Sequence, residues 1–334
     1  MGHMEKINWA VLGCGNIAKT FMSSVKKVAN AKVVACASSE LSRAQDFAKT
    51  HNIDKPFGSY SSMLQDDSVD AVYIATTHNF HFSLIMQCLK QGKHVLCEKP
   101  ITLNAQQAKV AFDYAQKHKL LLIEAVWTRF LPAILSLKET IQSGVIGNVQ
   151  CVQSNFSLNR ILPDSHRLNN KKLAGGALLD LGIYPITIAD IVFGEMPKNI
   201  HSHFIETHTG VDKNSFFTLE YADGAIAQLA CGFRMSGPTY ANIMGDMGQI
   251  YVPHFLGAKE YTVTVEDEPG KTFSFNYGPG ENFVAEIAHM TECLLQGSVQ
   301  SELMPPQSTL RVLEIMDTIR QQWGFEYDNE SCEH

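Results

Sequence analysis

The stretch INWAVLGCGNIA, residues 7–18, decides the fold of this chain. An apolar run ends at Gly13 and Gly15 and a helical pattern follows at once, which predicts a strand, a tight turn and a helix. Gly13 permits the sharp turn, Gly15 leaves no Cβ between the backbone and a pyrophosphate, and Ala18 lets the helix pack closely on the strand. Two glycines also suit an ordinary strand–helix turn that needs φ > 0. Because the motif opens the chain and a second strand follows at 33–37, the sequence favours a dinucleotide site.

The first turn of the helix after the glycines is expected to meet the phosphates of this dinucleotide. Asn16 and Ile17 occupy that turn. Free backbone N–H groups and the positive end of the helix dipole favour an anion there. We therefore expect Asn16 and Ile17, together with the two glycines, to line the cofactor site.

Composition narrows the class of protein. The chain has 334 residues, enough for two domains, and a net charge of −7 without a dense basic run, which argues against a nucleic-acid surface. Its eight cysteines form no C-x-x-C pair, so neither a zinc knuckle nor a disulfide scaffold is expected, and a reducing cytoplasm fits best. No run of about 18 apolar residues is evident, so we expect no membrane span.

Two serines and an arginine stand where the ribose of a nicotinamide dinucleotide is recognised. The second strand ends at Ser38 and Ser39, and Arg43 follows in the next helix. An acidic residue there would bind the 2′-hydroxyl of NAD and repel the 2′-phosphate of NADP. Serine removes this repulsion, and hydroxyls with a guanidinium can hold a phosphate. The serines can instead cap the helix. The sequence favours NADP over NAD.

The third strand, expected at 71–75, is almost wholly apolar, as a parallel strand buried on both faces should be. It leads into Thr76, His78 and His81 at the carboxyl end of the sheet, where ligands bind in open α/β folds. Either histidine can face the cofactor or pack at the start of the next helix. All three side chains therefore stay candidates for the cofactor site.

A further signal is the triplet Glu98-Lys99-Pro100 at the end of the next strand. Pro100 fixes its own φ and favours an extended Lys99, so the lysine side chain leaves the strand end in a defined direction. Strands and helices alternate up to residue 125, which predicts an α/β dinucleotide-binding domain with a parallel sheet over residues 5–125.

The pattern changes in the second part of the chain. Residues 126–330 contain long strand-like runs, several of which alternate in polarity, and these predict an α+β domain with a large open, mostly antiparallel sheet. Between the runs, a helix that begins at two glycines carries Asp180 and Tyr184, four residues apart and so on one face. A last helix near 307–322 is expected to pack back on the first domain.

These landmarks together resemble the Gfo/Idh/MocA oxidoreductase family over essentially the whole chain. The resemblance rests on the G-x-G-x-x-A turn, on Glu98-Lys99-Pro100 and on the helix with Asp180 and Tyr184. It implies an N-terminal Rossmann domain for NAD or NADP and a C-terminal domain for substrate binding. The commoner family pattern has histidine at the position of Tyr184, so a histidine acid/base cannot be carried over.

The tyrosine, together with residues 124–130 and 175–184, is similar to one branch of the family. This is the branch of the dimeric dihydrodiol dehydrogenases, also known for NADP-dependent D-xylose 1-dehydrogenase activity. The resemblance implies hydride transfer between nicotinamide and a carbinol carbon of a sugar or vicinal diol, with Glu98 and Lys99 beside the cofactor. The alternatives are another sugar or anhydro-sugar reductase and, from a different class, a non-catalytic NADP(H)-binding sensor.

One proton must move with the hydride, and Tyr184 is the expected acid/base. The ordinary phenol pKa is near 10, and the Lys99 ammonium is expected to lower it. Lys99 can instead pass the proton itself. Asp180 would orient the substrate hydroxyl or Lys99. The alternatives are plain helix packing for Tyr184 and an ordinary ion pair or helix cap for Asp180.

Further along, the sequence offers weaker candidates. Aromatic residues at such positions belong to the core more often than to a site, but three side chains are candidates for a substrate pocket: Trp127, Arg129 and Phe156. A polar loop follows and is interpreted as solvated; it carries Arg160, His166 and Arg167.

The open sheet of the second domain predicts an oligomer. Large apolar faces on globular proteins usually pair, and a two-fold homodimer is the default. The strand-like run at 224–233 is a plausible contributor to such an interface. We expect no nucleic-acid or membrane partner.

Overall fold

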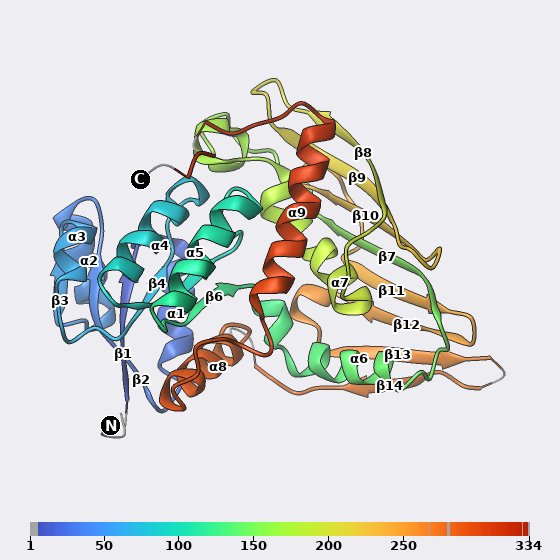
Figure 1. The fold of residues 1–334 in the computed structure, drawn as a ribbon, viewed down its shortest axis with the longest axis horizontal. Coiled ribbons are helices and arrows are strands. Elements are labelled where there is room, and N and C mark those ends of the chain that lie inside the picture. Colours follow the sequence, from blue (N-terminus) through green and yellow to red (C-terminus); the bar gives the residue numbers. More distant parts are fainter. Residues whose placement is uncertain (1–5, 267, 279–280, 329, 333–334) are drawn as a thin grey trace.

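The computed structural model describes residues 6–266, 268–278, 281–328 and 330–332. Within these ranges the chain forms two sheets, each with its own helices, and a long C-terminal helix runs between the two halves (Figure 1).

The N-terminal sheet is parallel, with strand order β3-β2-β1-β4-β5-β6. The predicted parallel α/β domain is confirmed. Strand order reverses between β1 and β4, and such a switch point opens a ligand crevice at the carboxyl ends of the strands. The strands are β1 (Ile7–Leu12), β2 (Ala31–Ala37), β3 (Lys55–Phe57), β4 (Ala71–Ile74), β5 (His94–Glu98) and β6 (Leu122–Ala125). The helices between them are α1 (Asn16–Val25), α2 (Leu41–His51), α3 (Tyr60–Leu64), α4 (His81–Lys90) and α5 (Ala105–Lys117).

The C-terminal sheet has the order β14-β13-β12-β11-β7-β10-β9-β8. Among the described strands, β7 and β10 pair in parallel and the other neighbours are antiparallel, which confirms the predicted mostly antiparallel sheet. The strands are β7 (Val149–Ser157), β8 (Asn199–Glu206), β9 (Asp212–Glu220), β10 (Ile226–Gly232), β11 (Tyr240–Gly245), β12 (Gly248–Pro253), β13 (Glu260–Val265) and β14 (Lys271–Ser274).

Four longer helices belong to the second half of the chain: α6 (Pro132–Gln142), α7 (Ile183–Phe193), α8 (Val284–Leu295) and α9 (Pro306–Gln322). Figure 1 shows α6, α7 and α9 on one face of the C-terminal sheet, while its other face carries no helix. Helix α8 instead packs on α1 and β1 of the first domain, and α9 contacts both α5 and α7. The two halves are therefore joined by helices as well as by the chain between β6 and α6.

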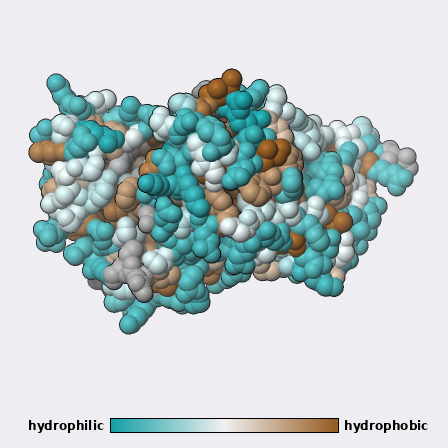
Figure 2. Space-filling model, turned by 90° about the horizontal axis from the view of Figure 1, so that it is seen from above, coloured by the Kyte–Doolittle hydropathy of each residue, from teal (hydrophilic) through white to brown (hydrophobic). Residues whose placement is uncertain are grey.

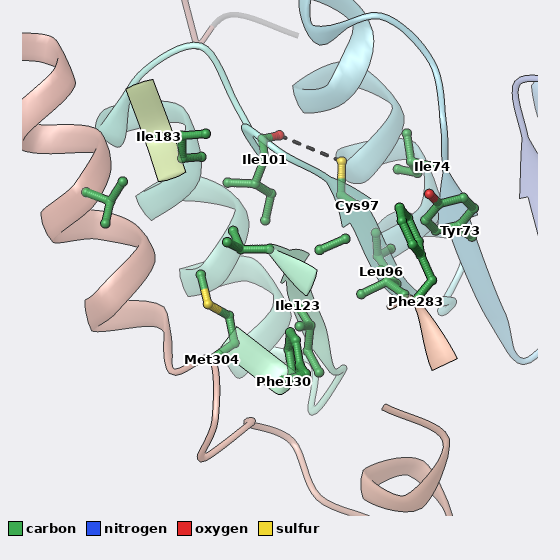
Figure 3. Close-up of a cluster of buried hydrophobic side chains, with 14 of the residues drawn as sticks. Tyr73, Ile74, Leu96, Cys97, Ile101, Ile123, Phe130, Ile183, Phe283 and Met304 are labelled. Carbon is green, nitrogen blue, oxygen red and sulfur yellow. Dashed lines mark hydrogen bonds between the residues drawn. The ribbon is translucent and has the colours of Figure 1, made fainter. Parts of the chain in front are cut away.

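A single hydrophobic core runs through both halves. In Figure 3, Phe283 lies beside Tyr73 and Leu96 of the N-terminal sheet, and Ile183 of α7 lies beside Ile101. Tyr73, Ile101 and Ile183 are fully buried. Burying an aliphatic side chain of this size stabilises a fold by about 1.5–3 kcal/mol. This shared packing fixes the position of one domain relative to the other.

One segment corrects an expectation. Lys171–Phe193 is long and apolar enough to cross a membrane by length and composition, although the sequence appeared to hold no such stretch. In the structure 83% of its 18-residue apolar stretch is buried, as in the core helix of a globular protein.

The face of the molecule in Figure 2 is mainly hydrophilic, with hydrophobic residues in small separate patches. All eight cysteines are free thiols, as their spacing predicts.

Candidate functional site

A cavity of about 660 Å³ lies at the carboxyl ends of β1, β2, β4 and β5, where they face a loop of the second domain, residues 158–173. Asp180 lines this cavity, and Tyr184 is buried beside it next to Lys99. The lining also includes every residue predicted for the cofactor except His81: Gly13, Gly15, Asn16, Ile17, Ser38, Ser39, Arg43, Thr76, His78, Glu98 and Lys99.

The glycine turn has the geometry that a pyrophosphate requires. Gly13 has φ +92°, and a Cβ there would come within 2.8 Å of the Ala75 carbonyl oxygen. A Cβ on Gly15 would meet no atom within 4 Å among the described residues, so the turn borders open space. Helix α1 begins at Asn16 without a side-chain cap, which leaves its first N–H groups available to an anion. Ala18 is fully buried against the sheet. These residues fit a dinucleotide.

The adenosine end of the cavity carries an unpaired cation. Ser38, Ser39 and Arg43 all line it. The capping alternative for the serines is excluded, because Glu40 is the N-cap residue of α2 and no side chain there makes a cap bond. Arg43 forms no ion pair with any side chain in the described ranges. A guanidinium beside two hydroxyls fits a phosphate.

At the other end of the cavity, Lys99 joins the two domains. Its Nζ donates to the main-chain oxygen of Asp180 at 2.7 Å and to Asp180 Oδ1 at 3.0 Å. The ammonium also lies 5.0 Å from the centre of the Tyr184 ring. Asp180 belongs to a π-helical turn, Leu178–Gly182, that precedes α7, and not to a regular α-helix. Lys99 therefore contacts both residues predicted to share its site.

Asp180 has more than one cationic neighbour. Arg167 donates to its carboxylate with both terminal nitrogens at 3.0–3.1 Å, and His78 Nε2 lies 3.7 Å from Oδ1. Burial alone would raise the pKa of Asp180, but Lys99, Arg167 and His78 outweigh it and lower the pKa below its usual value. The carboxylate is therefore ionised at neutral pH.

The pKa of Tyr184 is higher than the ordinary value, whereas from the sequence Lys99 is expected to lower it. Lys99 does lower the pKa of the phenol, but burial acts more strongly in the opposite direction and raises it to about 12. Burial lowers the pKa of Lys99, yet Asp180, Tyr184 and Glu98 together hold it above its ordinary value. Tyr184 and Lys99 consequently both carry a proton at neutral pH.

The two candidate histidines occupy different environments in the structure, and one of them, His78, lines the cavity. The Nδ1 atom of His78 lies 3.3 Å from the Ala174 carbonyl oxygen. His81, also predicted for the cofactor site, does not line the cavity, because its ring is fully buried between the carbonyls of Pro100 and Thr76, at 2.8 and 3.3 Å. Burial lowers the pKa of His81 to about 4. It packs at the start of α4, the alternative that the sequence left open.

Glu98 is a buried support of the lysine. Its carboxylate accepts a hydrogen bond from the Tyr73 hydroxyl and, at 3.3 Å, from the main-chain N–H of Lys99. Burial raises the pKa of Glu98 above its ordinary value. The bond to Lys99 fixes the backbone where β5 ends and the lysine side chain leaves.

An aromatic cage surrounds Tyr184. Trp127 Nε1 donates to the tyrosine oxygen at 3.0 Å, and Phe156 meets the tyrosine ring edge to face at 5.7 Å. Phe283, which the sequence did not single out, stacks on Trp127 at 6.0 Å. Trp127 and Phe156 thus lie beside the expected acid/base and position it.

Arg129, predicted as a substrate residue, lies outside the cavity lining. Its side chain is buried and pairs with Asp190 of α7. Arg311 of α9 donates to the other oxygen of the same carboxylate at 2.7 Å. Arg129 therefore belongs to a buried ion cluster that connects α7 and α9.

We expect Arg129→Met to lower the free energy of unfolding by about 3 kcal/mol, because a buried carboxylate loses one of its two partners. Urea unfolding measures this, and NADPH titration by fluorescence should show unchanged affinity. Lys109→Met, which breaks an exposed pair in α5, is the control and should change the unfolding free energy by less than about 0.5 kcal/mol. A higher KM for the substrate with an unchanged unfolding free energy would return Arg129 to the substrate pocket.

Arg167 is the site residue that sequence reasoning missed, since its loop was interpreted as solvated. The signal lay in the two glycines that follow. A Cβ on Gly175 would come within 2.4 Å of the Arg167 carbonyl oxygen, and the Gly176 N–H bonds to the Leu168 carbonyl at 3.0 Å. The glycines let the loop fold back tightly on the helix start, which brings Arg167 to Asp180.

Asp212 supports the same helix start and was also missed. Its Oδ2 accepts from the Leu178 N–H and the Ser215 hydroxyl, both at 2.7 Å. Burial raises its pKa to about 7. The carboxyl thus holds the π-helical turn that carries Asp180.

The fold and the cavity define a nucleotide-binding oxidoreductase with a Rossmann domain, and comparison with known proteins agrees. Residues 7–126 match the oxidoreductase family GFO_IDH_MocA with its NAD-binding Rossmann fold, and residues 134–251 match the GFO/IDH/MocA C-terminal domain. The trans-1,2-dihydrobenzene-1,2-diol dehydrogenase of Xenopus tropicalis is 31% identical over 96% of this chain and 98% of its own. That of Bos taurus is 32% identical, with the same coverage.

Solved structures show the same architecture. A 3-ketoreductase from Actinomadura kijaniata, in complex with NADP and TDP-benzene, is 25% identical and superposes with a TM-score of 0.83, over 95% of this chain and 97% of that one. The aldose-aldose oxidoreductase of Caulobacter crescentus shares the fold with a TM-score of 0.86 at 21% identity, over 96% and 98% of the two chains. The chain belongs to the GFO/IDH/MocA oxidoreductase family.

Proposed function

We propose that this protein is an NADP(H)-dependent oxidoreductase that interconverts a carbinol and a carbonyl carbon of a sugar or vicinal diol. The observation that carries the proposal is the contact of Lys99 with both Asp180 and Tyr184 at the end of the cavity. Full-length relatives named as dihydrodiol dehydrogenases and a ketoreductase that binds NADP support it.

The protein's own part is to move a proton at the phenol of Tyr184. When bound, the nicotinamide supplies the hydride chemistry. In reduction, Tyr184 is protonated and gives its proton to the substrate oxygen. The phenolate that remains is stabilised by the Trp127 N–H and the Lys99 ammonium, which are already in contact with it. In oxidation the phenolate form of Tyr184 takes the proton from the substrate hydroxyl, while the Trp127 N–H and the Lys99 ammonium stabilise that phenolate.

The positions of these groups are fixed before a substrate enters. Asp180 holds the Lys99 ammonium, and Arg167 holds Asp180. Phe156, Trp127 and the buried flank of α7 exclude water from the tyrosine. In such a low-dielectric site, charge–dipole contacts to a developing phenolate are stronger than they are in water.

We expect Tyr184→Phe to lower kcat for carbonyl reduction by roughly 10²- to 10⁴-fold while NADPH affinity stays unchanged, because the variant removes only the acidic proton. NADPH absorbance with a panel of D-xylose, D-glucose and a cyclic trans-diol, with their carbonyl counterparts, measures turnover. Tyr114→Phe changes a phenol of α5 that stacks on His118 outside the cavity lining; it is the control and should keep wild-type kcat.

The pH profile tests the same role. A donor with a pKa of about 12 keeps its proton from about pH 6 to about pH 9, so kcat for reduction should be flat there and fall only as the pH rises towards that pKa. Strong turnover by Tyr184→Phe would transfer the acid/base role to Lys99. Tight NADPH binding without turnover on any substrate would favour a sensor.

For the cofactor, we expect Arg43→Ala to weaken NADP binding by roughly 10- to 100-fold, the effect of losing a charge-assisted contact to the 2′-phosphate. NAD binding should change by less than about two-fold, because NAD has no phosphate there. Lys49→Ala removes a positive charge from the last turn of the same helix and is the control. Equal losses for both cofactors would place Arg43 elsewhere on the dinucleotide.

We also propose a homodimer through the face of the C-terminal sheet that carries no helix. This face has a groove of about 290 Å³ whose described lining has no charged side chain, with Phe216, Gln228 and Tyr240 along it. Phe216 is 37% exposed there, which is unusual for phenylalanine. A two-fold axis places such an uncharged face against itself.

Phe216→Asp should convert the dimer into monomers, since it would bury two unpaired carboxylates at the interface. Light scattering coupled to size-exclusion chromatography gives the mass. Val299→Asp, which introduces the same charge at an exposed position between α8 and α9, should leave the dimer intact. A monomeric wild type would refute the proposal.

A further inference from the structure

A second unpaired guanidinium lies in the wall of the cavity opposite the Rossmann domain. Arg160 lines the cavity together with His166 and Arg167, all from the loop at 158–173. The backbone of Arg160 is held in place, since its N–H donates to the Phe233 carbonyl at 2.9 Å and Asn159 pairs with Arg234. Its side chain is exposed and forms no ion pair within the described part of the chain.

Arg160 enters the cavity from the same loop as Arg167, which bonds to Asp180 where the reaction is proposed. Burial lowers the pKa of His166, and the positive charges of Arg167 and Arg160 lower it further against the opposing effect of Asp180. All four groups line the same cavity. His166 Nδ1 accepts from the Leu168 N–H at 3.2 Å, so the neutral ring carries its hydrogen on Nε2 and is a donor.

The charges at this end do not balance. Lys99 and Arg167 share the single carboxylate of Asp180, and Glu98 is buried and bonded to Tyr73. Arg160 adds a positive charge that no described acidic group compensates. An excess of cations with free donors favours an anion, and a guanidinium binds carboxylate or phosphate through two parallel hydrogen bonds.

Residues other than Arg160 suit the phosphates of the dinucleotide. The glycine turn and the start of α1 suit the pyrophosphate, and Arg43 lies at the adenosine end. Arg160 instead lines the cavity from the loop of the second domain that also supplies His166 and Arg167, and Arg167 is bonded to Asp180. We infer that the substrate carries an anionic group, a carboxylate or a phosphate, which Arg160 and His166 bind while Arg167 stays on Asp180. The inference rests on the proposed function, whose substrate class it narrows.

The test compares neutral and anionic partners that share one sugar skeleton: D-glucose, D-glucuronate and D-glucose 6-phosphate, with NADP at fixed ionic strength. The wild type should have at least a ten-fold higher kcat/KM for one of the anions than for D-glucose. A preference for the uronate identifies a carboxylate, and a preference for the phosphate ester identifies a phosphate.

Variants at Arg160 test whether this residue causes the preference for an anionic substrate. Arg160→Gln should lower kcat/KM for the preferred anion by roughly 10- to 100-fold, mainly through KM, and change that for D-glucose by less than about two-fold. Arg160→Lys should retain part of the preference. Arg234→Gln removes a neighbouring positive charge outside the cavity lining and should have no effect.

A readout that needs no anionic substrate completes the test. At saturating NADP, inorganic phosphate should inhibit competitively against any neutral substrate that turns over, and Arg160→Gln should abolish this inhibition. Equal kcat/KM for neutral and anionic sugars, or a rise in KM for NADP in Arg160→Gln with the preference intact, would overturn the inference and leave the proposed function standing. Absence of turnover with every sugar and diol would overturn both.

Discussion

The contact between Lys99 and Asp180 is the constraint on which the rest of the site depends. It joins the end of β5 in the first domain to the helix start of the second, across 81 residues of sequence. A buried charge is costly to desolvate, and the cost is offset only where partners surround it with good geometry. Here the carboxylate receives Lys99 and Arg167, and the ammonium also bonds to a backbone carbonyl. Without the second domain, the Lys99 ammonium would lose the carboxylate and the backbone carbonyl to which it donates.

The same ammonium sets the protonation of its neighbours. It keeps Asp180 ionised, and it opposes the effect of burial on Tyr184, whose pKa would otherwise lie still higher. A phenol that holds its proton at neutral pH is a ready donor for carbonyl reduction, and the Trp127 N–H stabilises its conjugate base. The aromatic cage thus has two roles, because the side chains that raise the pKa by excluding water also position the group that stabilises the phenolate.

The sequence predicted the parts of this site that depend on local pattern. Glycine spacing, apolar strands and the turn of Pro100 are properties of a few consecutive residues, so Gly13, Lys99 and the parallel sheet follow from them. Arg129 could not be placed in the same way. Its partner Asp190 is 61 residues away, and a buried arginine in an ion cluster has the same sequence signature as one in a pocket.

Long-range packing also explains why the structure differs from the sequence-based expectations at Tyr184 and Arg167. The raised pKa of Tyr184 depends on how deeply α7 is buried, and the role of Arg167 depends on a loop that two glycines fold back. Both are set by the tertiary fold. A single sequence shows which residues are able to ionise, but the balance between desolvation and charge, which decides whether they do, exists only in the packed structure.

The C-terminal helix α9 fixes the segment that follows Lys99. Glu124 accepts from the Ile101 N–H at 2.9 Å and from Thr309 of α9 at 3.0 Å. Further along α9, Arg320 donates to the Leu103 carbonyl at 3.0 Å. The chain after Lys99 is therefore held by the C-terminal helix and by Glu124 of the Rossmann sheet. The position of Lys99 beside Asp180 thus depends on residues of the first domain and of the C-terminal helix.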